Sequence, residues 1–154
     1  MNLDSGALVR RVAVLEKRVD DLPRPERGWT PVFLAEPYTN ANFNGDSFSD
    51  VAALTKIENT SWSTTVPADA KALIILAQCR DSGSAAGGDL VVKLYSAAAA
   101  TNEALNCRCG GLTNDYLTSN QGIVPATDGD IWYTVNASGA NTMDIWLTVV
   151  GYWT

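Results

Sequence analysis

Hydrophobic residues near the start of the chain recur at alternating steps of four and three. The stripe consists of Leu8, Val12, Leu15, Val19 and Leu22. This spacing keeps one narrow apolar edge of a helix against a partner helix, with the valines at heptad position a and the leucines at position d. Arg11 and Glu16 then flank the seam, where they can pair between chains. The pattern predicts a short coiled-coil stem over residues 1–22.

The number of helices in this stem is suggested by the run from Arg11 to Glu16. It resembles the short Arg-apolar-x-x-apolar-Glu signature of three-stranded coiled coils, so we favour a trimer. β-branched residues at a with leucine at d also suit a dimer. A third interpretation is one amphipathic helix docked on its own domain, although such a helix usually has a wider apolar face. Because a helix of about 20 residues is barely stable alone, the stem needs support from the rest of the chain.

After the stem, the hydrophobic period changes from 3.6 to 2. Pro23 and Pro25 end the helix, and residues 23–28 are expected to form a stiff hinge. Strands are expected at residues 29–34, 51–58, 61–66, 71–80, 89–95, 105–112, 116–124, 131–136 and 142–153, with 38–50 as a turn-rich loop and the last two strands as a hairpin. Short strands separated by turns predict an antiparallel β-sandwich over residues 29–154, most plausibly a jelly roll.

Both faces of the last two expected strands are apolar. Strict alternation puts Ile145, Leu147, Val149 and Trp153 on one face of the last strand, and Trp146, Thr148, Val150 and Tyr152 on the other. A sandwich strand usually leaves one face to water, so we expect another subunit to cover the second face. The candidate subunit interface consists of Trp132, Trp146, Val150 and Tyr152. Alternatives are an aromatic patch for a ligand and cover by loops of the same chain.

Charge is unevenly distributed along the chain. The formal net charge is -6, yet residues 1–27 hold six basic and five acidic side chains, and the rest holds five basic and twelve acidic ones. Such a negative head would repel phosphate backbones, so we expect no nucleic-acid partner. No apolar run is long enough to span a bilayer, and the N-terminus lacks the apolar core of a signal peptide. We therefore expect no membrane partner and synthesis in a cytoplasm without Sec-type export.

Catalytic motifs are missing from the sequence. The chain has no histidine, which excludes Ser-His-Asp and Cys-His machinery and histidine-bearing metal sites. No GxSxG motif, phosphate-binding loop or dinucleotide fingerprint follows an expected strand. The aspartate pairs of the chain resemble solvated loop residues rather than the two carboxylates of a glycosidase. We predict no enzymatic activity and no cofactor. Cys79, Cys107 and Cys109 are interpreted as small buried hydrophobes, with a bridge from Cys79 to one of the others as the alternative.

Two weaker patterns suggest ligands. Alternating oxygen-bearing side chains resemble the start of a calcium loop: Asn40, Asn42, Asn44, Asp46 and Asp50. The neutral amides and the missing closing carboxylate favour ordinary turn chemistry, so we predict no metal. Trp29 and Trp62, near the ends of expected strands, could stack on sugar rings, although aromatic residues in strands are more often buried.

Two stretches resemble segments of fibre and decoration domains of tailed bacteriophages, namely TVPADAKAL at 65–73 and LTVVGYW at 147–153. With the stem, hinge and β head, they make the chain look like an accessory virion protein. The resemblance implies a homotrimer attached by one end to phage capsid or tail proteins, located on the virion after assembly in the host cytoplasm, with no catalytic residues. We predict a capsid decoration or head-fibre protein. The alternatives are a receptor-binding tail-fibre or adhesin knob that binds a host surface glycan, and a carbohydrate-binding β-sandwich module.

Overall fold

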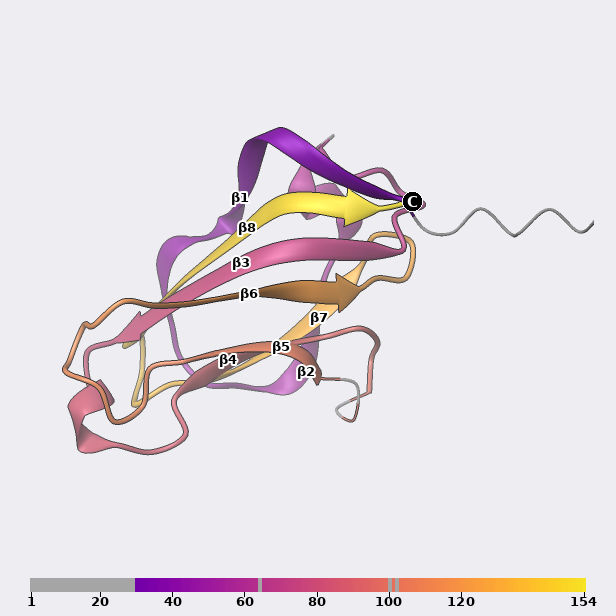
Figure 1. The fold of residues 1–154 in the computed structure, drawn as a ribbon. Helices are drawn as coiled ribbons and strands as arrows, with labels where there is room; N and C mark the ends of the chain where they lie inside the picture. The colour runs from indigo at the N-terminus through magenta and orange to yellow at the C-terminus, as the bar shows by residue number, and fades with distance from the viewer. Residues whose placement is uncertain (1–29, 64, 100, 102) are drawn as a thin grey trace, which may run out of the picture. The chain divides into compact units, whose positions relative to one another are not determined.

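The computed structural model describes residues 30–63, 65–99, 101 and 103–154 (Figure 1). The predicted hinge at 23–28, Trp29 and all predicted stem residues lie outside the described residues. Those stem residues are Leu8, Arg11, Val12, Leu15, Glu16, Val19 and Leu22. Residues 31–154 form one compact unit.

The regular structure of this unit is almost entirely β, which confirms a mainly β fold. The strands are β1 (Pro31–Phe48), β2 (Val51–Ile57), β3 (Ala72–Asp81), β4 (Val91–Tyr95), β5 (Glu103–Arg108), β6 (Thr118–Pro125), β7 (Ile131–Asn136) and β8 (Met143–Trp153). Two short 3-10 helices, η1 (Asn59–Trp62) and η2 (Ser84–Ala86), lie in the connections.

The strands form two antiparallel sheets of four strands each. The first sheet has the order β1-β8-β3-β6 and the second has the order β2-β7-β4-β5. In Figure 1 the four strands of the first sheet lie side by side, and every consecutive pair of strands except β4–β5 crosses from one sheet to the other. The strand order therefore comes from crossovers rather than from hairpins.

The core lies between the inner faces of the two sheets. Alternate residues of β3 and β8 pack there together with Val92 and Leu94 of β4. The expected central strand at 71–80 is confirmed as β3, which pairs with β8 on one side and β6 on the other. Both faces of β3 are shielded near its start, where Ala72 and Ile74 are buried although they are not part of the core cluster.

Three sequence predictions about the strands are wrong. Residues 38–50 were expected as a loop, but all except the last two belong to β1, because β8 continues alongside and register shifts absorb the turn-forming residues. The described residues of the expected strand at 61–66 do not form one, since Ser61 and Trp62 belong to η1 and residues 63, 65 and 66 follow it as turn and bend. β7 and β8 do not form a hairpin, because β7 pairs with β2 and β4 whereas β8 pairs with β1 and β3.

Candidate functional site

The outer face of the first sheet is apolar at the end where β1 begins. We call this surface the apolar face and define it by Phe33, Ile74, Leu76, Ile123, Val150 and Trp153. The strand neighbours of these residues point inward, as Leu34, Ile75 and Val124 do when they pack in the core. Phe33 is 71% exposed and Ile123 is 50% exposed. Ile74 between them is only 6% exposed, so the parts of the apolar face that a partner can reach are its two edges at Phe33 and Ile123.

An extra residue in β8 determines which of its last aromatic side chains joins this face. Ile74 pairs with Gly151 whereas Ile75 pairs with Val149, so Val150 has no partner of its own in β3. A bulge of this kind reverses the alternation of the residues that follow. Tyr152 consequently packs against the core, and Trp153 falls on the outer face. The sequence analysis placed these two aromatic residues on the opposite faces, because it assumed uninterrupted alternation.

The far end of the same sheet is polar. The guanidinium carbon of Arg80 lies 5.5 Å from the centre of the Trp146 ring, and Arg80 Nε donates to Asp144 Oδ2 at 2.8 Å. Gly45 packs closely against the Trp146 ring. Its φ is +85°, and a Cβ at this position would come within 2.7 Å of the indole. The half-buried Trp146 is thus already in contact with its own chain.

The predicted subunit interface is divided by the fold. Trp146 and Val150 lie on the outer side of β8, whereas Tyr152 packs toward the core. Trp132 belongs to β7 in the second sheet, and its neighbour Tyr133 packs inward, so Trp132 points to the outer side of that sheet. These four residues do not form one continuous surface.

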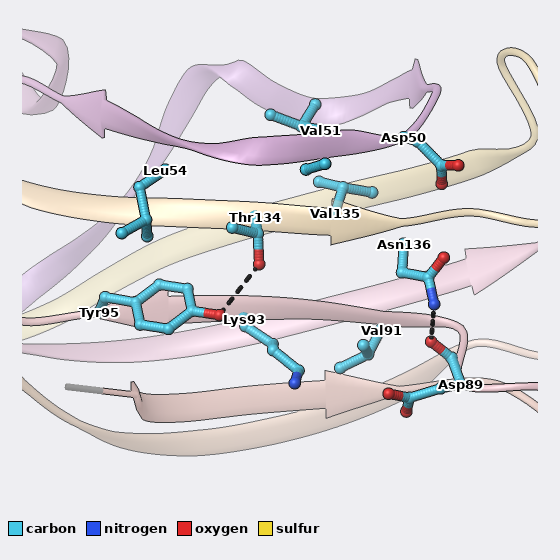
Figure 2. Close-up of a pocket in the computed structure, with 11 residues that line it drawn as sticks. Asp50, Val51, Leu54, Asp89, Val91, Lys93, Tyr95, Thr134, Val135 and Asn136 are labelled. Carbon is cyan, nitrogen blue, oxygen red and sulfur yellow. Dashed lines mark hydrogen bonds between the residues drawn. The ribbon is translucent and has the colours of Figure 1, made fainter. Parts of the chain in front are cut away.

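The outer face of the second sheet contains a pocket of about 320 Å³. It lies over β2, β4 and β7 and is shown in Figure 2. Leu54 and Val91 supply apolar surface, and Lys93, Tyr95 and Thr134 supply polar groups. Asp50, Asp89 and Asn136 also line it. The pocket therefore combines an apolar surface with hydrogen-bonding groups.

Polar groups around this pocket hold one another in place. The Tyr95 hydroxyl lies 3.2 Å from Thr134 Oγ1 (Figure 2), and Lys93 Nζ pairs with Glu103 at 3.3 Å. Asn136 Nδ2 donates to the backbone carbonyl oxygen of Asp89 at 2.6 Å, and the Asp89 carboxylate pairs with an arginine of β5. The local charges are thus largely paired, which suits a neutral ligand better than an ionic one.

Sequence reasoning missed this pocket. The signal was present in part, because the alternation in 89–95 separates Val91, Lys93 and Tyr95 from the core residues of the same strand. The sequence does not show which strands pair with β4, and in the structure its neighbour on this side is β7 rather than β3. That pairing places Trp132 opposite Tyr95 at the edge of this surface.

The calcium-like pattern is taken up by the strand rather than presented as a loop. Asn40 is fully buried, its Oδ1 accepts from the Asn42 backbone at 2.9 Å, and its Nδ2 donates to the Ser61 carbonyl at 3.2 Å. Asn44 and Asp46 lie in β1 on either side of a register shift, and Asp50 Oδ1 accepts from the Ala137 backbone at 2.7 Å. Among the described residues, no group of three or more His, Cys, Asp or Glu side chains is placed to hold a metal ion.

Trp62 cannot stack on a ligand. Its side chain is completely buried in the core cluster, because η1 turns the indole inward. The preferred interpretation of Trp62 as a buried aromatic is therefore confirmed, and the alternative that it stacks on a sugar ring is wrong.

The three cysteines meet in the core. All are buried and free, as the sequence analysis preferred. Cys79 of β3 and Cys107 of β5 have their Sγ atoms 3.4 Å apart, and the Thr118 hydroxyl lies 3.5 Å and 3.3 Å from these two sulfurs. Cys109 follows directly after β5, and its thiol lies 4.0 Å from the Leu90 carbonyl oxygen.

A buried carboxylate ties the end of β3 to the connection between β7 and β8. Asp81 accepts hydrogen bonds from the Gly83 backbone at 2.7 Å, from the backbone and hydroxyl of Ser138, and from the Thr142 hydroxyl at 3.0 Å. Burial raises the pKa of Asp81, but these hydrogen bonds outweigh that effect, so its pKa is lowered from the ordinary 3.8. The satisfied acceptors indicate a structural role.

Comparisons with known proteins add no further candidate. No family model and no curated protein matches the sequence, and no solved structure matches the fold. Among the described residues, no helix has the length and hydrophobicity needed to cross a membrane. Function is therefore inferred from the sequence and from the two outer faces.

Proposed function

We propose that this chain is a non-enzymatic, homotrimeric structural protein of a tailed-phage particle, bound to the capsid as a decoration or head-fibre protein. The observation that carries the proposal is the apolar face, because soluble monomers rarely leave such a surface uncovered. Phe33 and Ile123 are large apolar side chains on opposite edge strands of one sheet, and each has at least half of its surface exposed to solvent. Burial of this surface between copies would remove both from water.

We infer a jelly roll from the strand order. Two four-stranded sheets with the orders β1-β8-β3-β6 and β2-β7-β4-β5 are what two interlocked Greek keys produce. Viral capsid domains use this fold, and so do lectins. The fold therefore supports a role in a particle, and it is equally compatible with a sugar-binding role.

The predicted coiled-coil stem belongs to the same proposal. A helix of this length needs further contacts between chains to stay assembled, and the apolar face can supply them. Phe33, the first residue of the apolar face along the chain, is separated in sequence from the last stem residue, Leu22, only by the hinge and the start of β1. Both features call for other copies of the chain.

Light scattering on the purified full chain tests the association. We expect three times the chain mass of 16.4 kDa. Phe33→Asp combined with Ile123→Asp should lower that mass, since both side chains are exposed and a charge there blocks association without disturbing the core. Ala104→Asp, at an exposed position of β5 in the other sheet, is the matched control and should leave the mass unchanged. A monomeric wild-type protein would overturn the trimer, and a double variant that keeps its mass would overturn this interface.

Particles test the biological part of the proposal. Virions that lack the protein should lose resistance to heat or low salt while they still adsorb to cells. Virions of unchanged resistance would argue against a decoration role.

An adhesin that binds a host surface glycan is the second candidate, and the pocket over β2, β4 and β7 favours it. A sugar ring presents apolar C–H surface, which matches the side chains of Leu54 and Val91. It also presents neutral hydroxyl groups, which match the hydroxyl groups of Tyr95 and Thr134. Trp132 at the edge could add a stacking surface.

A pocket-filling variant separates the two candidates. Ala52 lines the pocket and is exposed, so Ala52→Trp should abolish binding to an array of neutral oligosaccharides if the adhesin proposal is right. Ala104→Trp on β5 serves as the control for an added surface indole. Wild-type protein that binds no oligosaccharide and does not compete with adsorption would eliminate the adhesin and leave the trimer untouched.

A further inference from the structure

We propose that Cys79 and Cys107 are an oxidation site, at which a disulfide forms between the two sheets when the protein passes from a reducing to an oxidising environment. The inference does not depend on the proposed function. It goes beyond the preferred interpretation of these residues as inert core side chains, because the fold brings together two thiols that are 28 positions apart.

The geometry favours this pair. The two Sγ atoms lie 3.4 Å apart in van der Waals contact, and the Cys79 thiol also points at the Cys107 carbonyl oxygen at 3.4 Å. Thr118 of β6 donates its hydroxyl proton to the Cys79 carbonyl at 3.2 Å. Its oxygen then faces both thiols, which holds them side by side.

The position of the pair in the fold gives the bond a structural effect. Cys79 lies on β3, an inner strand of the first sheet, and Cys107 lies on β5, an edge strand of the second. Both side chains point into the core. A bond between them would add a covalent cross-link through the core of the sandwich, where the facing strands β3 and β5 are otherwise held together by packing and hydrogen bonds.

Cys109 gives the cluster a more acidic thiol. The hydrogen bond from Cys79 lowers the pKa of Cys109, although burial opposes this effect. The hydrogen bond to Cys107 lowers the pKa of Cys79, but hydrogen bonding with Cys109 and burial raise it to about 12 overall. The hydrogen bond from Cys79 and burial also raise the pKa of Cys107. In the closed fold the pair is therefore slow to react, and fraying of the edge strand β5 is what would expose Cys107.

The chemistry balances with a disulfide as oxidant. One thiolate attacks a sulfur of oxidised glutathione, and one glutathione thiolate leaves. The second thiol then loses its proton and attacks the mixed disulfide, releasing the second glutathione. The two cysteines together lose two electrons and two protons, and the glutathione disulfide is reduced to two thiols.

Oxidised glutathione is the probe for the test, applied to the reduced full chain both in the native state and during refolding from urea. Free thiols are then alkylated and the bonds are mapped by mass spectrometry. We expect one internal disulfide between Cys79 and Cys107, with Cys109 alkylated. Because the bond closes a loop of about 30 residues, the melting temperature should rise by about 10 °C and fall back when a reductant is added.

Two variants make the test specific. Cys107→Ala should form no internal disulfide and show no rise in melting temperature, whereas Cys109→Ala should behave like the wild type. The refolding experiment covers the case in which the native core excludes glutathione. Three free thiols after oxidative refolding, mixed disulfides alone, or a bond mapped to Cys79 and Cys109 would each overturn the proposal.

Discussion

The outer face of the first sheet and the outer face of the second sheet cover the same core with different chemistry. At the end where β1 begins, the first presents the exposed side chains of Phe33 and Ile123. The second presents paired charges, with Lys93 bound to Glu103 and Lys56 bound to Asp130, around a hollow lined by both polar and apolar groups. The first surface suits contact with another protein chain, and the second suits water or a small neutral ligand.

The difference arises from positions that do not affect the core. The core cluster between the two sheets is apolar, with three cysteines and Met143 among its aliphatic and aromatic residues, so folding alone does not require the outer faces to differ. Selection for solubility would place charges on both. An apolar outer face on only one sheet therefore points to a partner on that side.

The largest effect should come from Gly151→Ala. A Cβ on Gly151 would lie 2.6 Å from the Val32 carbonyl oxygen and 3.1 Å from Ile74 Cδ1, so β1 would have to move away from β8 and the apolar face would be disrupted. We expect a loss of about 3 kcal/mol in the free energy of unfolding, measured by urea titration. Gly139→Ala is the control, since its nearest neighbour is Thr142 Cγ2 at 3.4 Å. Equal stability of the two variants would show that β1 is not held close to β8.

Asp81→Asn should rank next, with a loss of about 2 kcal/mol. Asp81 accepts four hydrogen bonds where the end of β3 meets the β7–β8 connection. These bonds help to hold the two sheets, and so their two outer faces, in position relative to each other. An asparagine amide has one acceptor oxygen, so it would leave some of these donors unpaired. The exposed Asp46→Asn change serves as the control.

The pH dependence of stability provides a second readout of Asp81. The pKa of Asp81 is lowered in the folded state from 3.8, so its contribution is present above pH 3.8 and is lost as the pH falls through the lower folded value. Wild-type protein should therefore lose stability below about pH 4 more steeply than Asp81→Asn does. If the free energy of unfolding fell equally with pH in both proteins, Asp81 would not be the carboxylate that stabilises the fold above about pH 4.

Tyr95→Phe should have a smaller effect, confined to the second sheet. The change removes the hydrogen bond between the Tyr95 hydroxyl and Thr134 Oγ1 and should lower the free energy of unfolding by about 1 kcal/mol. Tyr116→Phe is the matched control, because Tyr116 is 59% exposed. The mass measured by light scattering should not change in either variant. A change in mass with Tyr95→Phe would place the proposed subunit contact on the second sheet instead of the first.

The smallest effects should come from the ion pairs of the two faces. Lys93→Met breaks a half-exposed pair with Glu103 and should change stability by less than about 0.5 kcal/mol, and less still at high salt. Arg80→Met removes both the pairing with Asp144 and the contact over the Trp146 ring, so we expect a slightly larger loss of about 0.5 kcal/mol. If Lys93→Met proved the more damaging, the charges of the second face would matter more than proposed here.

Much of the sandwich follows from the sequence, because burial dominates the choice of strands. The continuous apolar run at 71–80 predicted β3, and alternation predicted β4 and both faces of β7. The segment at 38–50 misled because Asn and Gly are turn formers in isolation. In β1 they are held by pairing with β8, and register shifts accommodate them.

The candidate surfaces were harder to predict than the strands. Alternation showed that Val91 and Lys93 point away from Leu94, but not which strands lie beside them. The pocket and the cysteine contact both depend on strand order, which is a long-range property. Burial of Trp62 follows from the general preference of aromatic residues for the interior, but the sequence did not show that η1 is the element that turns its ring inward.

Val150, the residue of β8 without a partner in β3, determines how the end of this strand responds to changes in chain length. Deleting Val150 would remove the bulge and leave the phenol of Tyr152 inside and the indole of Trp153 outside, because Gly151, Tyr152 and Trp153 already pair in regular register with Ile74, Leu73 and Ala72. Deleting Gly151 while the bulge stays would instead exchange the sides of the two aromatic rings. Two neighbouring one-residue deletions therefore have opposite outcomes: the first preserves the interior, and the second replaces a tyrosine there by a tryptophan.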